Sequence, residues 1–145
     1  MEKIKVMKLR AGATLPTYGS EQSAGADLYA CLEESVTIAP GETRFIPTGL
    51  AMELPVGTVG LLYARSGLAC KRGLAPANKV GVIDSDYRGE YIVALHNHGT
   101  ESQVIAHGER IAQLVITPVF TPGFQEADSL NETLRGNGGF GSTGL

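Results

Sequence analysis

Short apolar runs, broken by glycine, proline, asparagine or aspartate, follow one another along most of this chain. Runs of Val, Ile, Leu and Tyr between turn residues are typical of β-strands, whereas an amphipathic helix needs apolar positions three and four apart. The pattern predicts strands at residues 4–6, 43–54, 58–64, 91–95 and 111–119.

Two further features of the pattern define the fold class. Residues 91–95 are apolar on both alternating faces, which predicts a strand in the interior of a sheet. Seven prolines interrupt the chain too often for long helices, so we expect only one short helical turn, from residue 66 to about 72. The predicted fold is all-β, a jelly-roll-like or barrel-like β-sandwich with a mobile C-terminal arm.

Composition limits the class of protein. A chain of 145 residues is expected to form a single domain over 1–145, of which 121–145 is the arm. A net charge of −3 argues against a nucleic-acid partner, and we find no apolar run typical of a signal peptide or a membrane span. Cys31 and Cys70 are far apart, and unpaired thiols suit a cytoplasmic protein; a disulfide is the alternative.

The C-terminal tail, residues 135–145, has glycine at five of its last ten positions. Such a segment cannot pack a core, but it offers free backbone N–H groups, hydroxyls, a guanidinium and one flat ring. Those groups suit a polyphosphate that carries a planar base. The alternative is a frayed chain end. The groups in question are Arg135, Phe140, Gly141, Ser142 and Thr143.

The tail also approaches the Walker A pattern, because Gly136 is followed after four residues by Gly141, Ser142 and Thr143. A Walker A loop needs lysine before the Ser or Thr, and a helix after it. Ser142 occupies the lysine position, and no helix is expected after Thr143. We therefore expect a flap that the ligand orders, not a preformed phosphate loop.

Residues 81–90 are expected to form a strand, a tight turn and a second strand, with Gly89 supplying a turn conformation. The preference of aspartate for turns is enough to explain Asp86. It explains Asp84 poorly, because Asp84 directly follows the apolar pair Val82 and Ile83. Asp84, held at the end of a buried strand and partly desolvated, is the candidate general base.

Three other clusters carry candidate chemistry. Arg65, Ser66 and Gly67 end a predicted strand with a donor-rich turn, which favours an anion site or an ordinary helix start. Asp27, alone in a small apolar run, suits a hydrogen bond to a loop or a hard metal ion. Gln113 lies among apolar neighbours, where its amide must find a partner in the protein or a ligand.

Five segments, in order along the chain, resemble the motif set of the trimeric dUTP pyrophosphatases, the dUTPases: AGADLYA, RSGL, GVIDSDYRGE, GERIAQL and RGNGGFGSTG. The resemblance spans about residues 20 to 145. It implies Mg²⁺-dependent hydrolysis of dUTP to dUMP and pyrophosphate, which keeps uracil out of DNA and supplies dUMP for thymidylate synthesis. It also implies a jelly-roll-like subunit that forms a homotrimer with shared active sites.

The resemblance assigns a role to each candidate residue. Asp84 would deprotonate the water that attacks the α-phosphorus in line. Asp27 would hold Mg²⁺ through its water shell. The donors for the phosphate chain would be Arg65, Ser66, Gly67 and Gln113.

Specificity for deoxyuridine is assigned to residues 78–87. The amide of Asn78 would pair with uracil, with the neighbouring backbone of Gly81 and Val82 at the base edge. Tyr87 would lie against the deoxyribose and exclude a 2′-hydroxyl. The tail would stack Phe140 on the base and close on the β- and γ-phosphates. The tail residues in this role are Arg135, Gly141, Ser142 and Thr143.

Two alternatives share the fold. A dCTP deaminase would direct water at the pyrimidine C4 and release ammonia, and an idle relative would act as a binding or regulatory module. The intact tail and the turn from Asp84 to Tyr87 favour the phosphohydrolase. An idle copy would be expected to have lost Asp84 or Arg135, and both are present.

Overall fold

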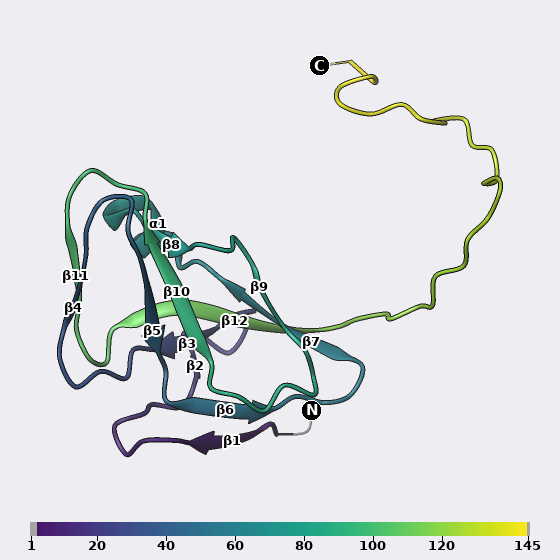
Figure 1. The fold of residues 1–145 in the computed structure, drawn as a ribbon. Helices are drawn as coiled ribbons and strands as arrows, with labels where there is room; N and C mark the ends of the chain where they lie inside the picture. Colours follow the sequence, from purple (N-terminus) through teal and green to yellow (C-terminus); the bar gives the residue numbers. More distant parts are fainter. Residues whose placement is uncertain (1–2, 145) are drawn as a thin grey trace.

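The computed structural model of the chain describes residues 3–144, which form short strands and one helix (Figure 1). Residues 1, 2 and 145, at the ends of the predicted domain, lie outside the described residues. The elements are β1 Lys5–Lys8, β2 Thr17–Tyr18, β3 Ala26–Tyr29, β4 Val36–Ile38, β5 Thr43–Pro47, β6 Leu50–Glu53, β7 Thr58–Tyr63, α1 Ser66–Arg72, β8 Leu74–Pro76, β9 Gly81–Ile83, β10 Ile92–Asn97, β11 Gln103–Ile105 and β12 Arg110–Pro118.

The strands form open antiparallel sheets. The largest has the order β2-β3-β12-β7-β9, and a second has the order β5-β10-β8. Two strand pairs, β1-β6 and β11-β4, complete the body. β10 contacts β12, and the buried core includes side chains from both larger sheets, such as Leu28, Ile46, Val93, Leu95 and Leu114. The predicted all-β, jelly-roll-like class is confirmed, and the described sheets are open and do not close into a barrel.

For the strand predicted at 91–95, the place inside a sheet is confirmed, but the two faces are not equally buried. β10 lies between β5 and β8, so its place inside a sheet is confirmed. Its burial alternates, however: Val93 and Leu95 are fully buried, whereas Ile92 is 48% exposed. The second apolar face is therefore not covered by this chain, and Phe45 on β5 adds to the same exposed surface.

The strand predicted at 43–54 is two strands. β5 pairs with β10 and β6 pairs with β1, so the chain changes partner at Thr48 and Gly49. The Thr48 hydroxyl donates to the Tyr91 carbonyl at 2.6 Å. Gly49 has a φ of +70°, and a Cβ there would lie 2.9 Å from the Cβ of Ala13. These contacts come from distant parts of the chain, so the apolar pattern alone did not predict the break.

The C-terminal arm leaves the body after β12. Val119 donates its N–H to Gly57, and from there the chain extends away and curls at its end (Figure 1). Large apolar side chains along the arm are almost fully exposed: Phe120, Phe124, Leu130, Leu134 and Phe140. The predicted mobility of the arm stays a prediction. Within residues 3–144 no helix has the length and apolar character needed to cross a membrane.

Candidate active site

A cleft of about 370 Å³ opens between the segment around β9 and the outer face of β5 and β10. Four predicted nucleoside-binding residues line it: Asn78, Gly81, Val82 and Tyr87. The other lining residues are Phe45, Leu62, Ile83, Glu90, Tyr91, Ile92 and Ala94. The structure therefore brings together the groups predicted to recognise the base and the sugar.

The polar end of this cleft is built on a tight turn before β9. Val80 donates its N–H to the Asn78 carbonyl at 2.7 Å, with Lys79 at a φ of +66° between them. Gly81 pairs with Leu62 of β7, and a Cβ on Gly81 would lie 3.1 Å from the Leu62 Cβ and 3.5 Å from Asn78 Nδ2. Glycine therefore avoids a tight contact with Leu62, and the Asn78 amide lies within ordinary contact distance of this position.

Tyr87 is fixed at the side of the cleft. Its hydroxyl donates to the Glu90 carbonyl at 2.9 Å, and its ring stacks on Tyr91 with centroids 6.1 Å apart and planes 23° apart. A Cβ on Gly89 would collide with the Tyr87 phenol. The predicted role of Gly89 is corrected: its φ lies outside the positive region, and it is needed because the ring lies across it.

Asp84 directly follows β9, as predicted, but its surroundings differ from the prediction. β9 is the edge strand of its sheet, Val82 is 67% exposed, and the Asp84 side chain is exposed too. The expectation of a buried strand and a partly desolvated carboxylate is therefore wrong for a single copy of this chain. The apolar pair that suggested burial lies beside an open edge.

A second group of predicted residues forms around Asp27. Arg65 donates from Nε to Asp27 Oδ1 at 2.8 Å, and Arg110 Nη1 lies 3.6 Å from Asp27 Oδ2. Gln113 donates to the Ala64 carbonyl at 2.9 Å. This group assembles because β12 pairs with both β3 and β7, which places Gln113 opposite Asp27 on one side and beside the end of β7 on the other.

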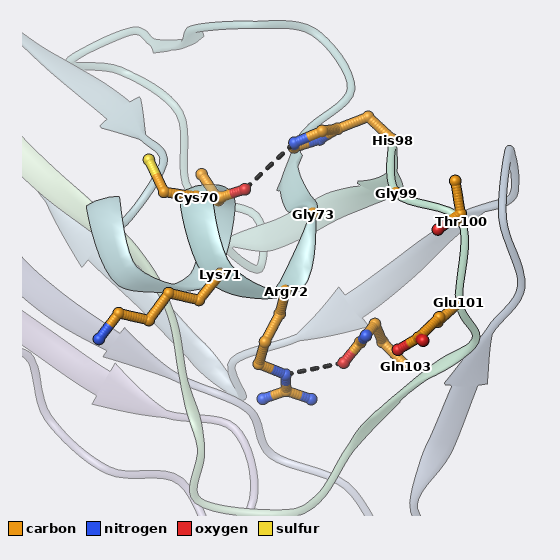
Figure 2. A pocket seen from close by; sticks show the side chains of 10 residues that line it. Cys70, Lys71, Arg72, Gly73, His98, Gly99, Thr100, Glu101 and Gln103 are labelled. Atoms are coloured by element: carbon orange, nitrogen blue, oxygen red, sulfur yellow. Dashed lines mark hydrogen bonds between the residues drawn. The ribbon is translucent and has the colours of Figure 1, made fainter.

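Ser66 and Gly67 begin α1, the helix predicted at these residues, and both are exposed. Arg72 at the other end anchors the helix, donating to Gln103 Oε1 at 3.0 Å and to the Val104 carbonyl at 2.6 Å (Figure 2). A second cavity of about 270 Å³ lies here, lined by residues 69–73, 98–101 and Gln103. Of the predicted site residues that the structure describes, none lines this cavity.

The two groups lie toward opposite ends of β7. On β9, Ile83 pairs with Gly60 of β7, so Asp84 lies one position beyond that pair, level with Val59. Arg65 lies at the other end of β7, just before α1. At roughly 3.3 Å per residue, the six positions from Val59 to Arg65 separate the two levels by about 20 Å. One chain therefore does not bring Asp84 and the Arg65 group together.

The predicted tail residues form a third, separate group. Arg135 donates from Nε to the Gly138 carbonyl at 2.9 Å, within its own turn. Phe140 is fully exposed at a φ of +51°, and Ser142 and Thr143 are exposed beside it. Within residues 3–144 the backbone hydrogen bonds of this segment are local turns.

The residues present fit a magnesium ion that is held mainly by substrate and water. Among residues 3–144 no group of three or more His, Cys, Asp or Glu side chains could hold a metal ion. Both oxygens of Asp27 face guanidinium groups, yet a carboxylate keeps further lone pairs that can accept from metal-bound water. Mg²⁺ usually keeps several waters and binds substrate phosphates, so this donor set suits it.

Sequence reasoning missed several residues of the cleft. Glu90 is one: Arg10 hydrogen-bonds to its carboxyl and lowers the pKa of that group. Tyr91 is another: its hydroxyl is buried with no hydrogen-bond partner among the described residues, and burial raises its pKa to about 12. The only sequence signal was their place directly after the predicted turn, whereas Phe45 enters the cleft through long-range strand pairing.

Comparison with known proteins gives the family. The dUTPase family model matches residues 11–144. The deoxyuridine 5'-triphosphate nucleotidohydrolase of Desulfitobacterium hafniense is 55% identical over 146 residues, covering 99% of this chain and 97% of that protein. The enzyme of the same description from Hahella chejuensis is 51% identical, covering 97% of this chain and 95% of that protein.

Solved structures agree with the sequence relatives. The Staphylococcus bacteriophage 80alpha dUTPase, described with dUPNHPP, has a TM-score of 0.92 at 30% identity and covers 100% of both chains. A mutant dUTPase of phage phi11, described as showing the coordination of a structural Mg(II) ion, has a TM-score of 0.82 at 26% identity, covering 90% of this chain and 100% of that one. The chain thus belongs to the dUTPase family, and its activity is the hydrolysis of dUTP to dUMP.

Proposed function

We propose that the cleft beside β9 binds the deoxyuridine half of dUTP and that Asp84, at its edge, activates the attacking water. The support is the cleft itself, which combines an amide, a close strand backbone and an anchored aromatic ring. Asn78 pairs with the uracil edge, and the backbone of Gly81 and Val82 reads the same edge. The narrow space left by this turn rejects the thymine methyl group and the different donor pattern of cytosine.

Tyr87 selects the sugar. Its ring is held flat by the Glu90 carbonyl on one side and by Tyr91 behind it. A deoxyribose packs on this ring, whereas a ribose would press its 2′-hydroxyl into it. Because the ring is anchored at both its hydroxyl and its face, it cannot move aside without losing those contacts.

Asp84 accepts a proton from the water that attacks the α-phosphorus. The new bond joins the water oxygen to that phosphorus, the bond to the bridging oxygen breaks, and pyrophosphate leaves with its electron pair. A base so placed contributes typically ~10²–10⁴-fold to the rate. Its exposure in one copy means that desolvation must come from other parts of the assembled site.

The phosphate chain is bound by the group around Asp27. Arg65 contacts Asp27 through Nε, and its two terminal nitrogens make no hydrogen bond to residues 3–144, so they can donate to phosphate oxygens. Ser66 and Gly67 add first-turn N–H groups that lack intrahelical acceptors, and Gln113 keeps a second amide hydrogen. When bound, Mg²⁺ neutralises charge on the triphosphate, and Asp27 orients it through water.

We further propose a homotrimer in which each site combines segments from different copies. The observation that carries this proposal is the separation of Asp84 from Arg65 by about 20 Å along the direction of β7, since the phosphate chain of one nucleotide is shorter than that. A third copy then supplies the tail.

In the closed site the tail covers the nucleotide. Phe140 stacks on uracil, while Arg135, Ser142 and Thr143 donate to the β- and γ-phosphates beside the flexible Gly141. Arg135 gives up only one contact to do so, the local bond to the Gly138 carbonyl. The free thiols Cys31 and Cys70 support the proposal that the enzyme works in the reducing cytoplasm.

Two measurements test this proposal. With Mg²⁺, the protein should release pyrophosphate from dUTP and no ammonia from dCTP, and ammonia release would contradict the assigned chemistry. Light scattering after gel filtration should give the mass of three 15.3 kDa chains. A monomer that is fully active at the same concentration would contradict the shared site.

A further inference from the structure

Arg10, in the loop after β1, makes a two-pronged ion pair with a residue of the nucleotide cleft. Its Nη1 donates to Glu90 Oε1 at 2.9 Å, and its Nη2 donates to Glu90 Oε2 at 2.7 Å. The two residues are 80 positions apart in the sequence. Parallel bonds between a guanidinium and a carboxylate fix both distance and orientation, which a single charge contact does not.

The pair is held on its other side by the backbone. Gly49 donates its N–H to Glu90 Oε2 at 3.3 Å, and the Glu90 side chain is only 18% exposed. Position 49 favours glycine for two reasons: its φ is +70°, and a Cβ there would lie too close to Ala13. The Arg10 contact is the largest cause that lowers the pKa of the Glu90 carboxyl. Glu90 is thus a partly buried carboxylate, and both of its oxygens accept hydrogen bonds.

The same residue holds Tyr87. The Tyr87 hydroxyl donates to the backbone carbonyl of Glu90 at 2.9 Å, and the ring crosses Gly89 and stacks on Tyr91. Glu90 lines the cleft, whereas Arg10 does not. A chain of contacts therefore runs from the loop after β1, through the side chain and then the carbonyl of Glu90, to the ring at the side of the cleft.

We propose that Arg10 is a positioning residue for sugar selection: its ion pair with Glu90 sets the position of the carbonyl that anchors Tyr87. The inference rests on the proposed role of Tyr87. Without Arg10, the Glu90 carboxylate keeps only the Gly49 N–H and turns toward water, because a partly buried charge without its partner is unfavourable. The Glu90 carbonyl and the Tyr87 ring then move, and a ribose gains room.

The test compares kcat/KM for dUTP and UTP in the assembled enzyme. Arg10→Met keeps most of the side-chain length and removes the charge, and Arg10→Lys keeps the charge but not the two parallel bonds. In Arg10→Met the ratio of dUTP to UTP efficiency should fall about tenfold, within the range of coupling inside one hydrogen-bonded network. Arg10→Lys should lie between Arg10→Met and the unchanged protein.

The matched control is Lys5→Met, which removes another cation of the N-terminal region. Lys5 pairs with Glu53 at 3.6 Å and its side chain is 83% exposed, so its loss should leave the ratio unchanged. Glu90→Gln should reproduce the Arg10→Met ratio, and the double variant should add nothing further if the pair acts as a unit.

Tyr87→Ala, measured beside these variants, distinguishes a failure of the inference about Arg10 from a failure of the proposed role of Tyr87. If Tyr87→Ala lowers the ratio and Arg10→Met does not, the inference about Arg10 is overturned and the role of Tyr87 stands. If neither variant changes the ratio, the proposed role of Tyr87 itself is overturned. Equal losses on dUTP and UTP in Arg10→Met, with a lower melting temperature, would show that Arg10 serves stability only and would overturn the inference.

Discussion

The nucleoside cleft and the C-terminal tail contrast in how firmly their functional groups are held. In the cleft, Tyr87 is fixed by a hydrogen bond and by a stacked ring. In the tail, Arg135 bonds to its own turn and Phe140 is fully exposed. The fold therefore organises one part of the proposed site in advance, and in the proposed trimer the other part is organised by ligand and neighbouring copies.

This contrast has an energetic consequence. Ordering the backbone costs about 1–2 kcal/mol per residue, and glycine loses the most freedom. In the proposed closed site, contacts of the tail with the triphosphate and the base offset that loss. The cleft is expected to determine which nucleotide binds, and the tail to determine how fast a bound nucleotide reacts.

The largest effect is expected for Asp84→Asn, which keeps the shape of the side chain but cannot accept the proton of water. Turnover should fall at least ~10²-fold while dUTP still binds, because general-base catalysis is lost. The readouts are kcat from pyrophosphate release and nucleotide affinity by calorimetry. Asp86→Asn, at the exposed tip of the same turn, is the control and should retain activity. The opposite pattern would identify Asp86 as the base.

The second-largest effect is expected for removal of the tail, which tests whether the tail acts in catalysis and not in stability. Truncation after Leu134 should leave the melting temperature and the assembly unchanged, since the backbone hydrogen bonds of residues 135–144 are local turns. Activity should still fall severely, because donors to the phosphate charge are lost; by analogy with the loss of an oxyanion-hole donor, each contributes about 2.7–4 kcal/mol to the transition state. A large loss of melting temperature would mean that the tail is structural. Near-normal kinetics would mean that it has no role in closure.

Tyr87→Ala probes the preorganised region alone. Removing the ring should reduce the preference for dUTP over UTP by about tenfold, a typical value for discrimination by pocket shape. Catalysis of dUTP itself should fall less than in the truncated enzyme, because the phosphate contacts remain. Steady-state kinetics with both nucleotides decides the matter, and an unchanged preference would place sugar selection elsewhere in the cleft.

The smallest effect is expected for Tyr91→Phe. The buried Tyr91 hydroxyl has no partner among the described residues, so its removal should raise the free energy of unfolding by about 1 kcal/mol. Its pKa is raised from 10.0 to about 12, so between these pH values the unfolded chain loses a proton that the folded chain keeps. Stability is therefore lost as pH rises through this window, and the Phe variant should lose less.

Tyr29→Phe is the matched control for that measurement. The Tyr29 hydroxyl has a partner, the Thr17 hydroxyl at 2.6 Å, so its removal should lower stability. Denaturant unfolding at neutral and alkaline pH gives both comparisons. A clear loss of stability in Tyr91→Phe would show that the assembled enzyme supplies a partner for this hydroxyl.

Local pattern was enough to predict much of the fold. β7 was predicted from its apolar run, and the helix from Ser66 to Arg72 was expected as the one short helical turn of a chain interrupted by prolines. Four residues of the cleft were predicted through the resemblance to the dUTPases, and the structure brings them together, while their roles stay predictions. The short strands β2, β3, β4, β8 and β11 were missed, since two to four residues show too little periodicity.

What the sequence could not predict depends on contacts between distant segments. The break between β5 and β6 depends on Tyr91 and Ala13, and the link from Arg10 to Glu90 spans 80 positions. The exposure of Asp84 depends on β9 being an edge strand, which is a property of sheet order. Strand order and edge position are fixed by tertiary packing, which apolar alternation does not encode.

The central claim is that no single copy contains a complete site, and mixed assemblies test it most directly. Asp84→Asn chains and Arg135→Ala chains are each purified, then unfolded together in equal amounts, refolded and assayed for pyrophosphate release from dUTP. If the base and the tail of one site come from different copies, random mixing restores both in about a quarter of the sites. Activity near that fraction of the unchanged enzyme is the predicted result, and activity no greater than the sum of the two separate variants would contradict the claim.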